Sequence, residues 1–131
     1  MKRPLPESLV FFVDRSLGRG VAEALRKGGA QAEHHDDHFA QDAPDQDWLG
    51  EVGRRGWLVL TKDKEIRRRT LEREALLAAG VRAFVLTSGN LRGAEMAEIF
   101  VRHLRRMERL ARRTPPPFIA RVTRTSVELY L

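Results

Sequence analysis

The 131-residue sequence contains no cysteine, and this absence excludes two kinds of site. Without thiols the chain forms neither disulfide bonds nor thiolate metal centres, and its composition gives no sign of an oxidising compartment. The sequence also lacks a long apolar run near its start. The first apolar run, at residues 9–13, is too short for a secretion signal or a membrane span. We therefore expect a cytoplasmic protein with no membrane segment.

Acidic and basic residues are unevenly distributed along the chain, whose net charge is +6. Residues 1–66 hold 10 basic and 12 acidic residues, whereas residues 67–131 hold 14 and 6. Lysine is scarce, and 20 of the 24 basic residues are arginine, whose guanidinium group forks onto phosphate. A basic surface beside an acidic cluster suits a metal-using enzyme with a polyanionic substrate. A generally arginine-rich proteome is the alternative explanation.

Apolar runs that alternate with amphipathic segments predict a doubly wound, mainly parallel α/β sheet. Strands are expected at residues 9–13, 57–61 and 81–86, with a weaker one at 30–33. Helices are expected at residues 17–27, from 44 onward, at 70–79, and as one long amphipathic helix over 93–113.

A triple proline separates the last predicted helix from a predicted closing hairpin. Its strands are expected at residues 118–122 and 126–131, with the turn at 123–125. We expect one domain over residues 1–131, with a core at about 8–111 and the hairpin as an extension at about 117–131.

Acidic residues follow the two most apolar predicted strands. Asp14 follows residues 9–13, Asp63 follows residues 57–61, and Glu65 lies two positions further on. Asp45 opens a predicted helix after a loop on the same edge of the sheet, where α/β proteins bind their ligands. Carboxylates gathered there repel one another unless a cation joins them, and Mg²⁺ or Mn²⁺ prefers such oxygen ligands. Helix capping and solvation are the alternative roles for these acids.

Four segments, residues 11–17, 21–25, 44–49 and 59–66, resemble compact PIN-like domains, and most closely the branch related to VapC-type toxins. They contain an Asp after the first strand, an Asp that opens a helix, and a Thr-Lys-Asp-x-Glu pattern after a later strand. The resemblance covers about residues 8–111. It implies a PIN-like fold, dependence on Mg²⁺ or Mn²⁺, and an endoribonuclease that is the toxin of a toxin–antitoxin pair. RNA is then the substrate, and a cognate antitoxin and a second copy of the chain are candidate partners.

The resemblance also implies roles for individual residues. Asp14, Asp45 and Asp63 correspond to metal-binding acids and, together with Glu65, to the catalytic group. Glu65 stands where the pattern usually has Asp, so its longer side chain either holds the metal through water or weakens the site.

Basic residues adjoin this acidic group in the sequence and are candidates for contacting an RNA backbone. They are Lys62, Arg67, Arg68 and Arg69. A solvated charged face is the alternative.

Residues 34–38, His-His-Asp-Asp-His, offer zinc-ligand types, but no paired helical spacing or second cluster supports zinc, and a flexible polar loop is favoured. Asp36 or Asp37 is a candidate auxiliary acid near the active edge. A non-catalytic PIN-like module that binds RNA or protein is the alternative function for the whole chain.

Overall fold

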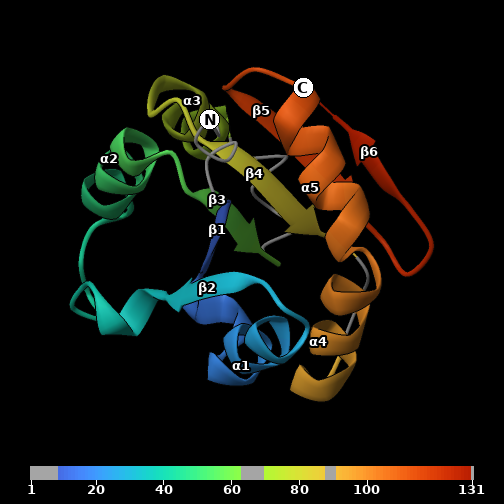
Figure 1. The fold of residues 1–131 in the computed structure, drawn as a ribbon. Coiled ribbons are helices and arrows are strands. Elements are labelled where there is room, and N and C mark those ends of the chain that lie inside the picture. Colours follow the sequence, from blue (N-terminus) through green and yellow to red (C-terminus); the bar gives the residue numbers. More distant parts are fainter. Residues whose placement is uncertain (1–8, 63–69, 88–90, 131) are drawn as a thin grey trace, which may run out of the picture.

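The computed structural model of the chain describes residues 9–62, 70–87 and 91–130, with residues 45–46 and 70–73 described by their backbone alone. A six-stranded sheet in the order β2-β1-β3-β4-β5-β6 runs through it (Figure 1). Neighbouring strands are parallel from β2 to β5, and β6 pairs antiparallel with β5, which confirms the predicted sheet and closing hairpin. The strands are β1 (Val10–Val13), β2 (Gln31–His34), β3 (Leu58–Thr61), β4 (Arg82–Leu86), β5 (Phe118–Val122) and β6 (Val127–Leu129).

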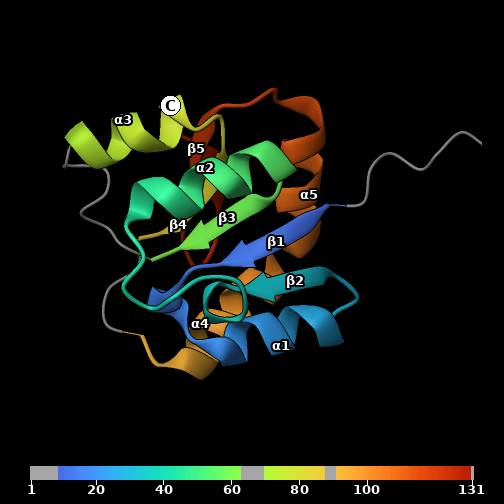
Figure 2. The same ribbon diagram turned by 90° about the vertical axis from the view of Figure 1, so that its left-hand side faces the viewer.

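Helices cover both faces of this sheet (Figure 2). Successive strand side chains point to opposite faces, so Phe11 and Val13 of β1 pack in one core cluster and Phe12 packs in the other. On the face of Phe11 lie α1 (Arg19–Lys27), α4 (Gly93–Arg102) and α5 (Leu104–Arg113), and on the face of Phe12 lie α2 (Asp45–Arg55) and α3 (Thr70–Ala78). Two short 3₁₀ helices, η1 (Arg15–Leu17) and η2 (His35–Asp37), follow β1 and β2.

The prediction of one continuous helix over residues 93–113 is wrong, because the chain breaks at His103 into α4 and α5. The His103 side chain is only 2% exposed, and its Nε2 lies 2.9 Å from the carbonyl oxygen of Thr123 and 3.3 Å from that of Arg124. A carbonyl only accepts, so the imidazole donates to the β5–β6 turn. The apolar stripe continues across the break, with Phe100 and Met107 both buried. The break thus coincides with a tertiary contact that the unbroken sequence pattern does not show.

Two glycines fix the position of α2 against its neighbours. A Cβ on Gly53 would clash with the carbonyl oxygen of Ala79, so a residue without a side chain permits this close approach to the end of α3. The helix then ends at Gly56, whose φ of 73° is the left-handed cap conformation that glycine favours. Because α2 leads back to the start of β3, its first residue, Asp45, lies at the edge of the sheet where the parallel strands end.

The C-terminal hairpin contributes directly to the core. Phe118, Ile119, Ala120 and Val122 of β5 are each no more than 1% exposed. The rings of Phe118 and Phe84 pack edge to face, with centroids 5.6 Å apart. Strand β5 therefore completes the central sheet beside β4.

Candidate active site

The candidate site lies where β1 and β3 end side by side. The chain leaves β1 toward β2 on one side and reaches β3 on the other, so this is the switch point at which open α/β sheets bind ligands. The Asp14 N–H donates to the carbonyl oxygen of Leu60 at 3.0 Å, which continues the β1–β3 pairing by one residue. Asp14 and Thr61, the last residue of β3, therefore meet at this edge.

Two hydroxyl groups hold the Asp14 carboxylate on one of its oxygens. Oδ2 accepts hydrogen bonds from Ser16 Oγ at 2.8 Å and from Thr61 Oγ1 at 2.9 Å. Thr61 is 3% exposed, so this end of the carboxylate is anchored in the protein. Within the described part of the chain, Oδ1 accepts no hydrogen bond. The carboxylate thus keeps one oxygen available for a ligand.

Arg15 is held beside Asp14 by residues from the segment that follows β2. Its Nε lies 3.1 Å from Asp36 Oδ1, and its Nη1 donates to the carbonyl oxygen of Gln41 at 3.3 Å. The same Asp36 oxygen lies 3.0 Å from His35 Nδ1. That hydrogen bond from His35 is the main reason why the pKa of Asp36 is lowered, with Arg15 adding to the effect. Ionised Asp36 only accepts, so His35 carries its proton on Nδ1.

The prediction of a flexible polar loop over residues 34–38 is wrong. His34 is the last residue of β2, η2 follows it directly, and His34 and His35 are 3% and 2% exposed. His35 packs among the rings of Phe12, Phe39 and Trp48, at centroid distances of 6.0, 5.6 and 5.4 Å. Aromatic packing supplied by other elements buries an imidazole that its polar neighbours had suggested was exposed.

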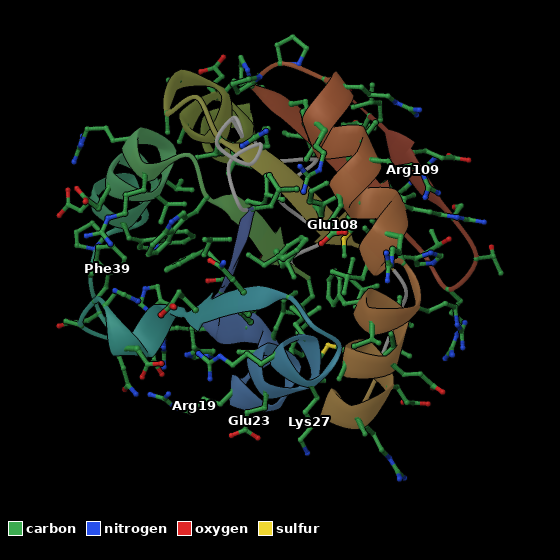
Figure 3. The ribbon with its side chains drawn as sticks, in the orientation of Figure 1. Arg19, Glu23, Lys27, Phe39, Glu108 and Arg109 are labelled. Carbon is green, nitrogen blue, oxygen red and sulfur yellow. The ribbon has the colours of Figure 1, made fainter. Side chains whose placement is uncertain are left out.

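His34 and Asp37 fasten η2 to the rest of the fold. His34 Nδ1 accepts from the backbone N–H of Asp36 at 3.1 Å, and burial lowers the pKa of His34. Asp37 pairs with Arg19 at the start of α1, with Nη1 and Oδ1 2.7 Å apart; Figure 3 labels Arg19 and Phe39 near this segment. Asp36 therefore lies beside the predicted edge as an ionic partner of Arg15, and Asp37 is turned toward α1.

A surface hollow of about 330 Å³ opens at this edge. It brings Asp14 and Arg15 together with η2 and the start of α2, which the order of residues in the sequence does not reveal. Its lining comprises Asp14, Arg15, Ser16, His35, Gln41, Ala43 and Trp48.

The other predicted site residues are described to different extents. Asp45 is the first residue of α2, as predicted, but its side chain is outside the description. Lys62 directly follows β3 and is exposed. The remaining predicted residues lie outside the described ranges: Asp63, Glu65, Arg67, Arg68 and Arg69.

The donor chemistry at Asp14 fits a hard divalent cation such as Mg²⁺ or Mn²⁺, because the groups at this edge are carboxylate and hydroxyl oxygens. Across residues 9–62, 70–87 and 91–130, no three His, Asp or Glu side chains converge as metal ligands. Asp14 is the one predicted metal-binding acid whose side chain is described, because the side chains of Asp45 and Asp63 lie outside the described part of the structure. Zinc at residues 34–38 is not supported, because His35 Nδ1 faces Asp36 and His38 Nε2 faces Glu33.

In the part of the chain that is described, no helix is both long enough and apolar enough to cross a membrane.

Comparison of the sequence with known proteins identifies a family. Residues 9–88, which contain Asp14, Asp45, Asp63 and Glu65, match the family model described as "PIN like domain". Over 114 residues the chain is 34% identical to a Mycobacterium tuberculosis (strain ATCC 25618 / H37Rv) protein named "Putative ribonuclease VapC45", and the match covers 83% of this chain and 82% of that protein. The chain therefore belongs to the PIN-like domain family, in the branch related to VapC-type toxin ribonucleases.

Proposed function

We propose that this protein is a metal-dependent endoribonuclease that hydrolyses RNA phosphodiester bonds as the toxin of a toxin–antitoxin pair. The observation that carries the proposal is the Asp14 carboxylate, which lies at the switch point and is held on Oδ2 by Ser16 and Thr61. The name of the mycobacterial relative supports RNA as the substrate. A cognate antitoxin and a second copy of the chain are the proposed protein partners.

In this proposal, Asp14, Asp45 and Asp63 bind Mg²⁺ or Mn²⁺, and Glu65 completes the catalytic group. The ion supplies an activated water and stabilises the charge that develops on the phosphate. The chain's own contribution is positional. Because Ser16 and Thr61 fix Oδ2, the carboxylate presents Oδ1 without losing rotamer freedom when the ion binds.

Basic groups beside the acids hold the substrate. Arg15 lines the same hollow as Asp14, and Asp36 and Gln41 orient its guanidinium group through Nε and Nη1, so Nη2 is left to donate to a phosphate oxygen. Lys62 and the arginines at positions 67–69 are the other basic residues proposed to contact the RNA backbone.

The decisive experiment removes one carboxylate charge and preserves its shape. Asp14→Asn keeps an oxygen that accepts from Ser16 and Thr61, so the fold should survive. Cleavage of a structured RNA with Mg²⁺ or Mn²⁺ should fall by at least about a hundredfold, the usual cost of losing one electrostatic stabiliser. Asp45→Asn and Asp63→Asn should lower RNA cleavage by a similar factor.

The matched control is Glu23→Gln, an equal charge change on the exposed side of α1 (Figure 3). It should cleave at the wild-type rate. Undiminished cleavage by Asp14→Asn, with a normal circular dichroism spectrum, would contradict the proposal. RNA binding by the wild type without cleavage in either metal would instead favour the non-catalytic module.

A further inference from the structure

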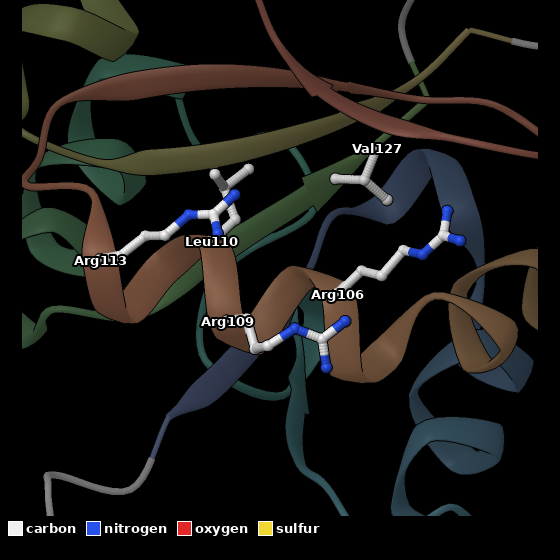
Figure 4. Close-up of a pocket in the computed structure, with 5 residues that line it drawn as sticks. All are labelled: Arg106, Arg109, Leu110, Arg113 and Val127. Atoms are coloured by element: carbon white, nitrogen blue, oxygen red, sulfur yellow. The ribbon is translucent and has the colours of Figure 1, made fainter.

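A second feature of the molecule, which we call the arginine groove, lies between α5 and β6. It has a volume of about 280 Å³ and is lined by Arg106, Arg109, Arg113, Leu110 and Val127. Figure 4 shows the three guanidinium groups spread along α5, at i, i+3 and i+7 spacing on the helix. The groove is a continuous basic surface with a small apolar floor.

The charges in this groove have no acidic partners in the described part of the chain. Arg106 Nη1 donates to the carbonyl oxygen of Thr125 at 3.2 Å, which orients the side chain but leaves its charge uncompensated. Some arginines elsewhere do have acidic partners: Arg19 binds Asp37, and Arg121 binds Glu128 at 3.1 Å. Like charges three and four residues apart on a helix destabilise it. An anion bound between them would offset that repulsion.

We propose that the arginine groove binds the phosphates of an RNA strand, at a distance from the carboxylate edge. Arg106 and Arg113 are separated by about 10.5 Å along the helix axis. A DNA strand in a duplex presents a phosphate about every 3.4 Å along its axis, so the stripe covers a length of about three phosphate spacings. Each guanidinium group offers a planar fork that matches phosphate oxygens. The identity of the polyanion as RNA rests on the proposed function.

RNA fits the groove better than an acidic protein does. Protein interfaces depend on aromatic or apolar anchors in pockets, whereas nucleic-acid interfaces are polar and strongly positive. The floor offers little apolar surface, because Leu110 is only 7% exposed and Val127 is half-buried. The lining itself thus carries charge spread along α5 and little apolar surface, as a phosphate backbone requires, and the exposed Leu129 of β6 is not part of it.

The distance between the two sites gives the groove a specific role. Four strand spacings, each about 4.8 Å, separate β6 from β1, or about 19 Å across the sheet. A dinucleotide at Asp14 does not reach the groove, whereas a longer RNA does. The groove therefore contributes affinity for long RNA and leaves the chemistry at Asp14 unchanged.

Binding is measured with fluorescein-labelled single-stranded RNA in EDTA, using the Asp14→Asn protein so that cleavage plays no part. Log Kobs falls as log[salt] rises. Adding Arg109→Gln and Arg113→Gln should make this negative slope shallower by about 1.4, because two contacts of about 0.7 each are lost. Arg106 is kept because it also binds the hairpin turn. The matched control, Lys27→Gln with Arg54→Gln, removes the same charge from exposed positions on α1 and α2 and should change the slope by less than half as much.

Two further readouts make the test decisive. In the background with intact Asp14, the groove variant should raise KM for a long RNA and leave dinucleotide cleavage unchanged. A groove variant that binds RNA like the control would overturn the inference, as would wild-type binding of polyglutamate in preference to RNA of equal charge. Failure of the proposed function would appear separately, as absent metal-dependent cleavage with the binding difference intact.

Discussion

The carboxylate edge and the arginine groove treat their charges in opposite ways. At the edge, Asp14 accepts hydrogen bonds from two hydroxyl groups, and Asp36 joins Arg15 to His35. In the groove, the arginines of α5 stand together without acidic partners in the described residues. Contacts that fix side chains hold the geometry that a catalysed reaction needs, and they restrict the rotamers of those side chains. Uncompensated charges attract a polyanion through counterion release and tolerate imprecise placement.

The largest expected difference between the two regions is their response to a divalent cation. An ion that binds only the folded site stabilises it by about 4.1 kcal/mol at a thousandfold excess over its dissociation constant. At roughly 2–8 °C per kcal/mol, Mn²⁺ should raise the melting temperature of the wild type by at least about 8 °C. Asp14→Asn should remove this response, and Arg109→Gln with Arg113→Gln should keep it. If Mn²⁺ raised the melting temperatures of the wild type and Asp14→Asn equally, the ion would not bind at Asp14, and the two regions would not differ in this response.

A smaller effect is expected from the buried hydroxyl of Thr61. Thr61→Val keeps the shape but removes the donor to Asp14 Oδ2, and a hydrogen bond to a charged group contributes about 1.5–3 kcal/mol to the free energy of unfolding. Thr125→Val, an exposed position beside the arginine groove, is the matched control and should be near neutral. Urea titrations of both variants measure the difference. Equal stabilities for the two would mean that the hydroxyl does not hold the carboxylate.

The smallest effect distinguishes the two regions by their response to pH. Burial lowers the pKa of His34 from its ordinary value of 6.5, so at mildly acidic pH the unfolded chain binds a proton that the folded chain does not. The contribution of neutral, buried His34 to the free energy of unfolding is therefore fully present above pH 6.5 and decreases as the pH falls below that value. The decrease is less steep than roughly 1.4 kcal/mol per pH unit, the slope expected when the unfolded chain binds one full proton more than the folded chain. The arginines of the groove stay charged throughout this range.

His34→Gln tests this pH dependence, because an amide oxygen can still accept from the Asp36 N–H but does not titrate. Between pH 7 and pH 5.5, urea titrations should show a smaller loss of stability in the variant than in the wild type. An identical pH dependence in the two proteins would show that His34 is not the group that titrates.

The sequence predicted the elements that local pattern determines. The apolar runs that became β1, β3 and β4 need only burial on both faces of a parallel sheet, and Asp14 stands where the first of them ends. Asp45 opens its helix as expected, because Pro44 precedes it with extended backbone and ends the loop. The metal-binding roles of Asp45 and Asp63 stay predictions.

The features that the sequence did not predict depend on partners far along the chain. His35 is buried by Phe12 and Trp48, which come from β1 and α2, and Asp36 meets Arg15 across 21 positions. His103 breaks a regular helical pattern to reach the turn between β5 and β6. Local periodicity describes which face of a segment is apolar, but it carries no signal for a single long-range hydrogen bond.

The place of β5 in the sheet has a consequence for how the protein is made. Strand β4 lies between β3 and β5, and its Arg82 pairs with Phe118, 36 positions further along the chain. At about 5–20 residues per second, a ribosome needs roughly 2–7 s to add those residues. During that interval β4 has one open edge and the sheet is incomplete. The sheet therefore closes beside β4 only after β5, the last of the parallel strands in the described part of the chain, has been made.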